Sequence, residues 1–412
     1  MSAQLTQARV GTAGAQAALK RGVAPRVAFR AAAQMKNSSS SAASSAAAPA
    51  AGRASVVAQA AAAPAAAKPT APAKRSEFEL FTFNTWLFNL DTELCTVLSS
   101  ISVACKQIAA AVGRAGISSL TGVAGTGENV QGEEQKKLDV ISNDIFSMCL
   151  RNCGRTGVIA SEEEENPIAV EETTSGNYIV VFDPLDGSSN IDAGISVGSI
   201  FGIYEPAEEC VVDMDDPEKT LSSCITNVCQ PGKNLLAAGY VLYSSCTILV
   251  ITTGDGVFGF TLDPYVGEFV LTHDRITIPE TGMIYAFNEG NYQLWDAGVK
   301  AYIDSLKEPS KWGGKPYSAR YIGSLVGDFH RTLLYGGIYG YPGDKKNTTG
   351  KLRLLYECAP MSMIAEQAGG KGSTGVERVL DVVPTKVHQR VPLFVGSKKE
   401  VEYLETFFAK KA

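Results

Sequence analysis

The chain has 412 residues, 45% of them apolar, and a formal net charge of −6, which leaves room for a sizeable core and about two domains. Its first 76 residues carry ten Lys or Arg and no Asp or Glu, so the remainder has 27 basic and 43 acidic residues, a net charge of −16. So acidic a body excludes nucleic acid and anionic membranes as expected partners. No apolar run reaches the roughly 18 residues of a membrane span.

The N-terminal segment, residues 1–76, differs in kind from the rest of the chain. It consists of long Ala, Ser and Pro stretches without the continuous apolar region of a secretory signal. This composition predicts an organellar transit peptide and a disordered leader, the alternative being a low-complexity tail without a targeting role. Val56-Val57-Ala58 is a plausible processing point.

Two helices are expected next along the chain. One runs from Asp91 to about Val112, and the second opens at Lys136-Lys137-Leu138-Asp139. In the second helix Leu138, Ile141, Ile145 and Met148 form an apolar stripe at helical spacing. Asp139 lies off that stripe near the helix start, where an acid is favoured by the helix dipole even without a catalytic role.

Acidic residues then follow two predicted strands. The strand Val158–Ala160 runs into Ser161-Glu162-Glu163, and the apolar strand Tyr178–Phe182 runs into Asp183-Pro184-Leu185-Asp186-Gly187-Ser188-Ser189-Asn190. Carboxylates and an exposed Leu185 carbonyl suit a divalent cation, while the N–H groups of Gly187 and Ser188 can face a phosphate. The alternatives are a solvated acidic run and a surface Asp-Gly turn.

A loop of more than twenty residues separates the strand Ile195–Tyr204 from the next strand, which starts near Asn234. It is acidic and contains Cys210, Cys224 and Cys229. Loops of this length inside a compact domain are usually functional or disordered. Five cysteines elsewhere in the chain lie in or near predicted helices and strands and are expected to be buried structural thiols. They are Cys95, Cys105, Cys149, Cys153 and Cys246.

Near the C-terminus an alternating strand is predicted from Lys351 to Tyr356, ending at Glu357. A helix then starts at Pro360 and stops at Gly369-Gly370. Without further information, Lys351 and Arg320 are interpreted as solvent-exposed cations with a structural role only. The several acids at strand ends, however, exceed what structure alone requires.

The chain resembles the fructose-1,6-bisphosphatases of the metal-dependent sugar-phosphatase superfamily from about Phe78 to its C-terminus. The Asp183 run through Asp192 by itself indicates only the superfamily. Arg320-Tyr321 and Lys351-Leu352-Arg353-Leu354-Leu355-Tyr356-Glu357 narrow the resemblance to this family. Further supporting segments are Val140–Asp144, Ser161–Glu163, Asn288–Gly290, Ala319–Tyr321 and Tyr335–Ile338.

The resemblance implies a role for each matching residue. Two to three Mg²⁺ per subunit would be held by Glu162, Glu163, Asp183, Asp186, Glu357 and the Leu185 carbonyl. Asp139 and Glu163 would activate the attacking water, and Asp186, Gly187, Ser188 and Ser189 would bind the end of the substrate that carries the 1-phosphate. Asn288, Tyr321, Tyr341 and Lys351 would bind the 6-phosphate and sugar, and Arg320 would reach into a neighbouring subunit's site. Animal members have a tyrosine directly after Asn-Glu-Gly, whereas here Asn291 holds that place and Tyr292 follows.

The cysteine loop, residues 207–232, resembles the redox-regulatory loop of the chloroplast members of the family. Cys210 would pair mainly with Cys224, and Cys229 would be the alternate partner. Reduction by thioredoxin would then activate the enzyme, since an exposed loop disulfide is typically labile. The implied location is the chloroplast stroma, and the implied reaction is the Calvin-cycle hydrolysis of fructose-1,6-bisphosphate.

For architecture, the resemblance implies the layered α/β sugar-phosphatase fold in a homotetramer. A metal-binding domain would span residues 77–276 and a sugar-binding domain residues 277–412. Two other functions stay open, a sedoheptulose-1,7-bisphosphatase and a catalytically silent stromal scaffold that binds partners through its acidic loop.

Overall fold

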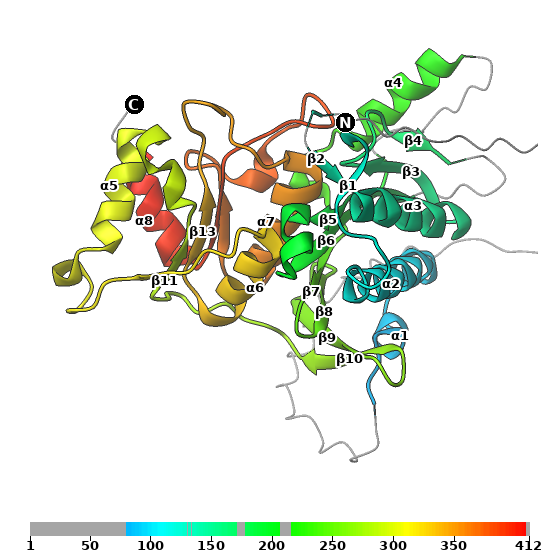
Figure 1. Ribbon diagram of the computed structural model, residues 1–412, viewed down its shortest axis with the longest axis horizontal. Helices are drawn as coiled ribbons and strands as arrows, with labels where there is room; N and C mark the ends of the chain where they lie inside the picture. The colour runs from blue at the N-terminus through cyan, green and yellow to red at the C-terminus, as the bar shows by residue number, and fades with distance from the viewer. Residues whose placement is uncertain (1–79, 130, 133, 171–177, 207–215, 409–412) are drawn as a thin grey trace, which may run out of the picture. The chain divides into compact units, whose positions relative to one another are not determined.

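The computed structural model describes residues 80–408, except 130, 133, 171–177 and 207–215 (Figure 1). These residues belong to one compact unit that begins at Pro72. The predicted leader, Cys210 and most of the acidic part of the cysteine loop lie outside the described residues.

The larger sheet has eight strands in the order β10-β9-β8-β7-β6-β5-β3-β4. Every residue of β5 is buried, as its continuous apolar sequence predicts. Because β3 and β5 are parallel neighbours, their C-terminal ends and the acids that follow lie at the same edge. The strands are β3 (Thr156–Ser161), β4 (Ile168–Ala169), β5 (Tyr178–Asp186), β6 (Val197–Tyr204), β7 (Ala237–Tyr243), β8 (Thr247–Thr252), β9 (Val257–Asp263) and β10 (Glu268–His273).

Helices α1 (Phe83–Leu87), α2 (Thr92–Gly113) and α3 (Lys137–Asn152) share a core with one face of this sheet (Figure 1). The predicted stripe of α3 is wrong in part, since Met148 is 62% exposed. The buried face instead follows a four-residue step, Leu138, Ser142, Phe146 and Leu150, and the Phe146 ring stacks 4.9 Å from that of Phe182 on β5. The aromatic contact with the sheet therefore sets the rotation of α3.

Helix α2 is long and apolar enough to cross a membrane by length and composition, contrary to the expectation from apolar runs. Its small and hydroxyl-bearing residues interrupt every continuous apolar run while keeping the mean hydropathy high. Val97, Leu98 and Ile101 are completely or almost completely buried and lie in the core that α2 shares with α3 and the sheet.

On the opposite face, α6 (Leu325–Tyr335) and α7 (Ala359–Gln367) lie between the two sheets. The strand predicted over residues 351–356 is wrong. A π-helix, η5 (Leu354–Cys358), leads directly into α7. All residues from Leu352 to Cys358 are buried, so the apparent alternation of apolar residues does not mark an exposed and a buried face. The predicted stop of the following helix is confirmed, with Gly369 at φ +88°.

The second sheet has the order β12-β11-β13-β15-β14, and α5 and α8 cover its outer face. The layers therefore alternate helix, sheet, helix, sheet, helix (Figure 1), which confirms the layered α/β fold. The elements are β11 (Ile284–Ala286), β12 (Ser318–Ala319), β13 (Ile338–Tyr341), β14 (Lys371–Ser373), β15 (Leu393–Gly396), α5 (Ala297–Leu306) and α8 (Lys398–Phe408). A small sheet of β1 (Val123–Glu128) and β2 (Glu134–Lys136) and the 3₁₀ turns η1 (Ser188–Ala193), η2 (Gly232–Asn234), η3 (Glu289–Leu294), η4 (Pro309–Lys311) and η6 (Val379–Asp381) complete the described elements.

The described part of the cysteine region, residues 216–232, contains a helix that the sequence did not predict. Helix α4 (Pro217–Val228) occupies most of it and packs against β3, β4 and β5. Cys224 is buried in the main core, because α4 turns one apolar face to the sheet, and Cys229 is half-buried at the end of that helix. The expectation of a buried Cys246 is wrong, since this residue is exposed in the turn between β7 and β8.

Candidate active site

A cavity of about 600 Å³ opens at the C-terminal end of β5, facing the second sheet. It brings together residues that are up to about two hundred positions apart in the sequence. Of the predicted residues, those lining it are Asp139, Glu162, Glu163, Asp183, Leu185, Asp186, Gly187, Ser188, Ser189, Asn288, Tyr321, Tyr341, Lys351 and Glu357. Arg320 is exposed and is not among the lining residues.

Three buried carboxylates converge at the floor of the cavity. Asp183 and Asp186 close strand β5, and Glu357 comes from η5. One carboxylate oxygen from each lies within 4.8 Å of the others. Oxygen donors at this separation are what a hard divalent cation takes as ligands.

Burial and mutual repulsion raise the pKa values of these carboxylates above the ordinary carboxyl range. Burial raises the pKa of Asp186 to about 6 and that of Glu357 to about 8, and it raises the pKa of Asp183 well above its usual range. Neighbouring carboxylates raise all three further because like charges resist ionising together. A cation would remove this penalty, so the donor set fits a divalent metal site.

Two further acids face the same cavity with raised pKa values. Asp139 is only 3% exposed, contrary to its expected place off the buried face of α3, and its carboxylate accepts the Lys136 N–H at 2.7 Å. Burial raises its pKa to about 7. Burial and the charge of Glu162 likewise raise the pKa of Glu163 to about 7, and the Gln135 amide donates to this carboxylate at 2.6 Å.

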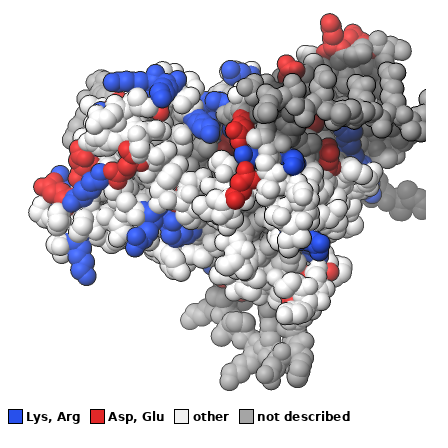
Figure 2. Space-filling model, in the orientation of Figure 1, with Lys and Arg blue, Asp and Glu red and all other residues white. Residues whose placement is uncertain are grey.

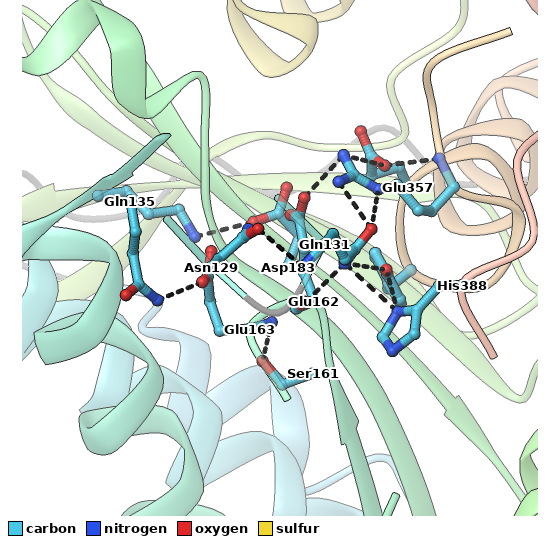
Figure 3. A network of polar contacts seen from close by, with 12 residues as sticks. Asn129, Gln131, Gln135, Ser161, Glu162, Glu163, Asp183, Glu357 and His388 are labelled. Carbon is cyan, nitrogen blue, oxygen red and sulfur yellow. Dashed lines mark hydrogen bonds and ion pairs between the residues drawn. The ribbon is translucent and has the colours of Figure 1, made fainter. Parts of the chain in front are cut away.

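Arg353 was not predicted as a site residue, yet it is the buried cation of the site. Its guanidinium lies 2.7 Å from Glu162, and its backbone N–H donates to Glu357 at 2.6 Å. Two further guanidinium N–H groups donate to the Gln131 side-chain oxygen at 3.1 and 2.9 Å (Figure 3). The signal in the sequence was an arginine inside an otherwise apolar run.

Gln131 connects this arginine to the rest of the network. Its amide donates to the Glu162 carbonyl at 2.8 Å and lies 3.5 Å from both the Tyr356 hydroxyl and His388 (Figure 3). His388 also contacts the Tyr356 hydroxyl at 2.7 Å. A polar network centred on Arg353 and Gln131 therefore holds Glu162 and Glu357 in place.

The turn after Asp186 has the geometry that its sequence predicts. Gly187 has φ +75°, a left-handed conformation that costs glycine little, and a Cβ there would lie 3.2 Å from that of Ser324. The 3₁₀ turn η1 starts at Ser188, and the Asn190 N–H closes back on the Gly187 carbonyl at 2.9 Å. A backbone turn of this kind can present N–H groups to an anion.

Polar groups of another kind also line the cavity. They are the exposed Lys351, together with Tyr321, Tyr341 and Asn288. Tyr292 does not line it, and its hydroxyl donates to Asp304 at 2.7 Å instead. The cavity thus combines a cluster of carboxylates with a cation, two phenols and an amide, which suits a substrate with more than one anionic group.

Comparisons with known proteins agree with this geometry. The family described as "Fructose-1-6-bisphosphatase, N-terminal domain" matches residues 77–274, and its C-terminal counterpart matches residues 278–409. The chain is 66% identical over 351 residues to the chloroplastic fructose-1,6-bisphosphatase of Brassica napus, covering 83% of this chain and 85% of the relative. It is 64% identical over 354 residues to that of Spinacia oleracea, covering 83% and 85%.

Among solved structures, fructose-1,6-bisphosphatase of Leishmania major in its holo form superposes with a TM-score of 0.76 at 43% identity, covering 80% of this chain and 99% of that one. The T-state form of the same protein gives a TM-score of 0.72 at 42% identity, covering 81% and 99%.

The fold and the carboxylate-lined cavity define a phosphatase, a hydrolase whose family implies a divalent metal cofactor. The chain belongs to the fructose-1,6-bisphosphatase family. The plant relatives are named chloroplastic, which supports a chloroplast location.

Proposed function

We propose that this enzyme hydrolyses the 1-phosphate of fructose-1,6-bisphosphate, giving fructose-6-phosphate and phosphate, with Mg²⁺ as cofactor in the Calvin cycle of the chloroplast stroma. The observation that carries the proposal is one cavity whose lining includes both a triad of buried carboxylates and the cation Lys351. A cavity that offers a cation-binding cluster and a separate anion-binding side chain suits a sugar esterified at both ends.

The metal site would be formed by Glu162, Glu163, Asp183, Asp186, Glu357 and the Leu185 carbonyl, with two to three ions. Bound Mg²⁺ would supply charge neutralisation at the phosphoryl oxygens and a water of lowered pKa. Arg353 balances Glu162 in the absence of substrate, so it keeps this carboxylate oriented.

Proton transfer is assigned to Asp139 and Glu163. Both have a pKa of about 7, so near neutral pH each can accept a proton from the attacking water. The turn formed by Asp186, Gly187, Ser188 and Ser189 would bind the end of the substrate that is cleaved. At the far end Asn288, Tyr321, Tyr341 and Lys351 would hold the sugar and its 6-phosphate, which provides binding energy that positions the reacting bond.

Thiol control is proposed through Cys210, Cys224 and Cys229, with thioredoxin as the reducing partner. The packing of α4 on β3 and β5 supports a mechanical link, because these strands carry Glu162 and Asp183 at their ends. If a Cys210→Ser variant still required a dithiol for full activity, the assigned disulfide would be wrong.

A homotetramer is also proposed, in which Arg320 reaches a neighbouring subunit's site. Its exposed position outside its own cavity is compatible with that role. The proposed domains are a transit peptide and leader at 1–76, a metal-binding domain at 77–276 and a sugar-binding domain at 277–412.

Phosphate release with Mg²⁺, measured on the mature protein before and after dithiol reduction, tests the proposal. Fructose-1,6-bisphosphate and sedoheptulose-1,7-bisphosphate are supplied separately, and preference for the fructose ester with activation on reduction is expected. Preference for the seven-carbon ester would move the enzyme to the related bisphosphatase. No release at all would favour the scaffold. Figure 2 shows acidic and basic side chains interspersed over the described part of the face in view.

A further inference from the structure

The segment Arg320–Gly323 brings Tyr321 to the cavity, and side chains hold its backbone at several points. It connects β12 to α6 and has no partner strand along most of its length. The Ile322 and Gly323 N–H groups donate to the Asp328 carboxylate at 2.9 and 3.0 Å. The Arg320 carbonyl accepts from Arg331 at 2.6 Å.

The two side chains that hold this segment also bind each other. The same Arg331 nitrogen that donates to Arg320 lies 2.6 Å from the Asp328 carboxylate, whose side chain has no exposed surface. Asn190, which follows the Gly187 turn, adds a third restraint by donating to the Gly323 carbonyl at 3.1 Å. The substrate-facing segment is therefore fixed from α6 on one side and from the phosphate turn on the other.

Asp328 is the acid in the first turn of α6 and pairs with Arg331 three residues later, but its carboxylate also bonds outside the helix. Ser324 caps this helix, since its hydroxyl accepts the Gly327 N–H, while the Asp328 carboxylate accepts from residues before the helix. Burying an ion pair is often no more stabilising than packing apolar groups of similar size. A buried pair whose bonds go to a binding segment is thus better explained by positioning than by stability.

We infer that Asp328 and Arg331 are positioning residues, which hold Arg320–Gly323 so that Tyr321 meets the substrate phosphate remote from the bond that is cleaved. This inference rests on the proposed function and extends it to two residues that do not line the cavity. It predicts a loss of substrate binding without loss of metal binding.

The first turn of α6 makes the two effects separable. On its other side the Ser324 hydroxyl and the Val326 N–H donate to Asp186, one of the clustered carboxylates, at 3.2 and 3.0 Å. A change at Ser324 should therefore alter the metal requirement. A change at Asp328 should alter the binding of the distal phosphate.

The experiment compares Asp328→Asn and Arg331→Ala with the wild-type enzyme. We expect KM for fructose-1,6-bisphosphate to rise about tenfold to a hundredfold, as for one lost charge-assisted hydrogen bond, while kcat and the Mg²⁺ midpoint stay close to wild type. The Kd of fructose-6-phosphate without metal, measured by calorimetry, should rise by the same factor. The double variant should be no worse than the single variants, because both remove one unit.

Glu400→Gln is the matched control, since Glu400 is also buried and accepts a backbone N–H from Gly282 and the Tyr317 hydroxyl, but it lies outside the cavity. It should leave KM unchanged. Ser324→Ala should shift the Mg²⁺ midpoint instead. Arg331 is half-buried, so its variant gives a folded protein to test if Asp328→Asn does not fold.

An unchanged KM and product Kd in folded Arg331→Ala would overturn the inference, as would a fall in kcat with an altered Mg²⁺ midpoint. Failure of the proposed function would look different. In that case the wild-type enzyme itself would release no phosphate from the bisphosphate and would bind no fructose-6-phosphate.

Discussion

Protons and Mg²⁺ should compete for the same carboxylates. The pKa values of Asp186, Glu163 and Glu357 are raised to about 6, about 7 and about 8. Raising the pH through this range should therefore strengthen metal binding, because each proton that leaves no longer has to be displaced. The perturbation is a pH change from about 6.5 to about 8.5 with no other alteration.

The magnitude follows from the three values. Near pH 6.5 the groups are about one quarter, three quarters and fully protonated, and they hold about two protons together. Near pH 8.5 they hold about one quarter of a proton. The apparent Kd for Mg²⁺ should fall about 100-fold between these conditions, and binding at the lower pH should release about two protons.

Without metal, raising the pH should lower the stability of the folded protein, although it strengthens metal binding. The folded protein binds protons more tightly than the unfolded chain, so its free energy of unfolding should fall as the pH rises from the ordinary carboxyl range to about 8. Mg²⁺ should restore stability most strongly at the high end of this range.

Calorimetric titration with Mg²⁺ in two buffers of different ionisation enthalpy counts the released protons. Glu400→Gln is the control, since burial also raises the pKa of Glu400, but this residue lies outside the cavity. Its proton count should equal that of wild type. An affinity that does not change with pH, or binding without proton release at about pH 6.5, would refute the reasoning.

Three substitutions give further predictions. Arg353→Met leaves the buried Glu162 and Glu357 without their cation. In the absence of metal, it should lower the free energy of unfolding, measured by urea denaturation, by about 3 kcal/mol. An unchanged urea midpoint would contradict this. Lys351→Met should raise KM for the bisphosphate at least about tenfold in steady-state assays, with a smaller change in kcat. A fall in kcat as large as the rise in KM would argue against a binding role. Gly187→Ala should lower the free energy of unfolding by about 1–2 kcal/mol, because Gly187 has a left-handed backbone, and it should also reduce activity. Gly194→Ala is its control. Gly194 is also left-handed, at φ +66°, but has open space around it, so this variant should lose stability alone.

Much of the site could be predicted because its residues lie in short runs at strand ends. The buried β5 and the turn after it follow directly from an apolar run, paired acids and a glycine. The parallel neighbour β3 then brings Glu162 to the same edge. Local sequence is sufficient in such places because the strand direction alone decides where the next side chain lies.

Other residues depended on tertiary contacts that no local pattern contains. Asp139 is buried because aromatic packing between Phe146 and Phe182 rotates α3 toward the sheet. Arg353 is buried against Glu162 and Gln131. These partners come from about two hundred residues earlier in the chain, so no local pattern predicts the burial. Helix α4 is not apparent from the sequence because its buried residues, Cys224, Asn227 and Val228, are a mixed set that gives a weak apolar stripe.

The π-helix before α7 has a consequence for how this enzyme can vary. Its bonds run from residue to residue over five positions, as from the Cys358 N–H to the Arg353 carbonyl, so it holds one residue more than a regular turn. Deleting a single residue there would give a more regular helix but would turn Glu357 by about 100° around the axis. Insertions and deletions in this short stretch should therefore leave a folded protein in which Glu357, the proposed metal ligand, no longer faces Asp183 and Asp186. A related chain that kept the fold but lost the activity would be expected to lose this extra residue first.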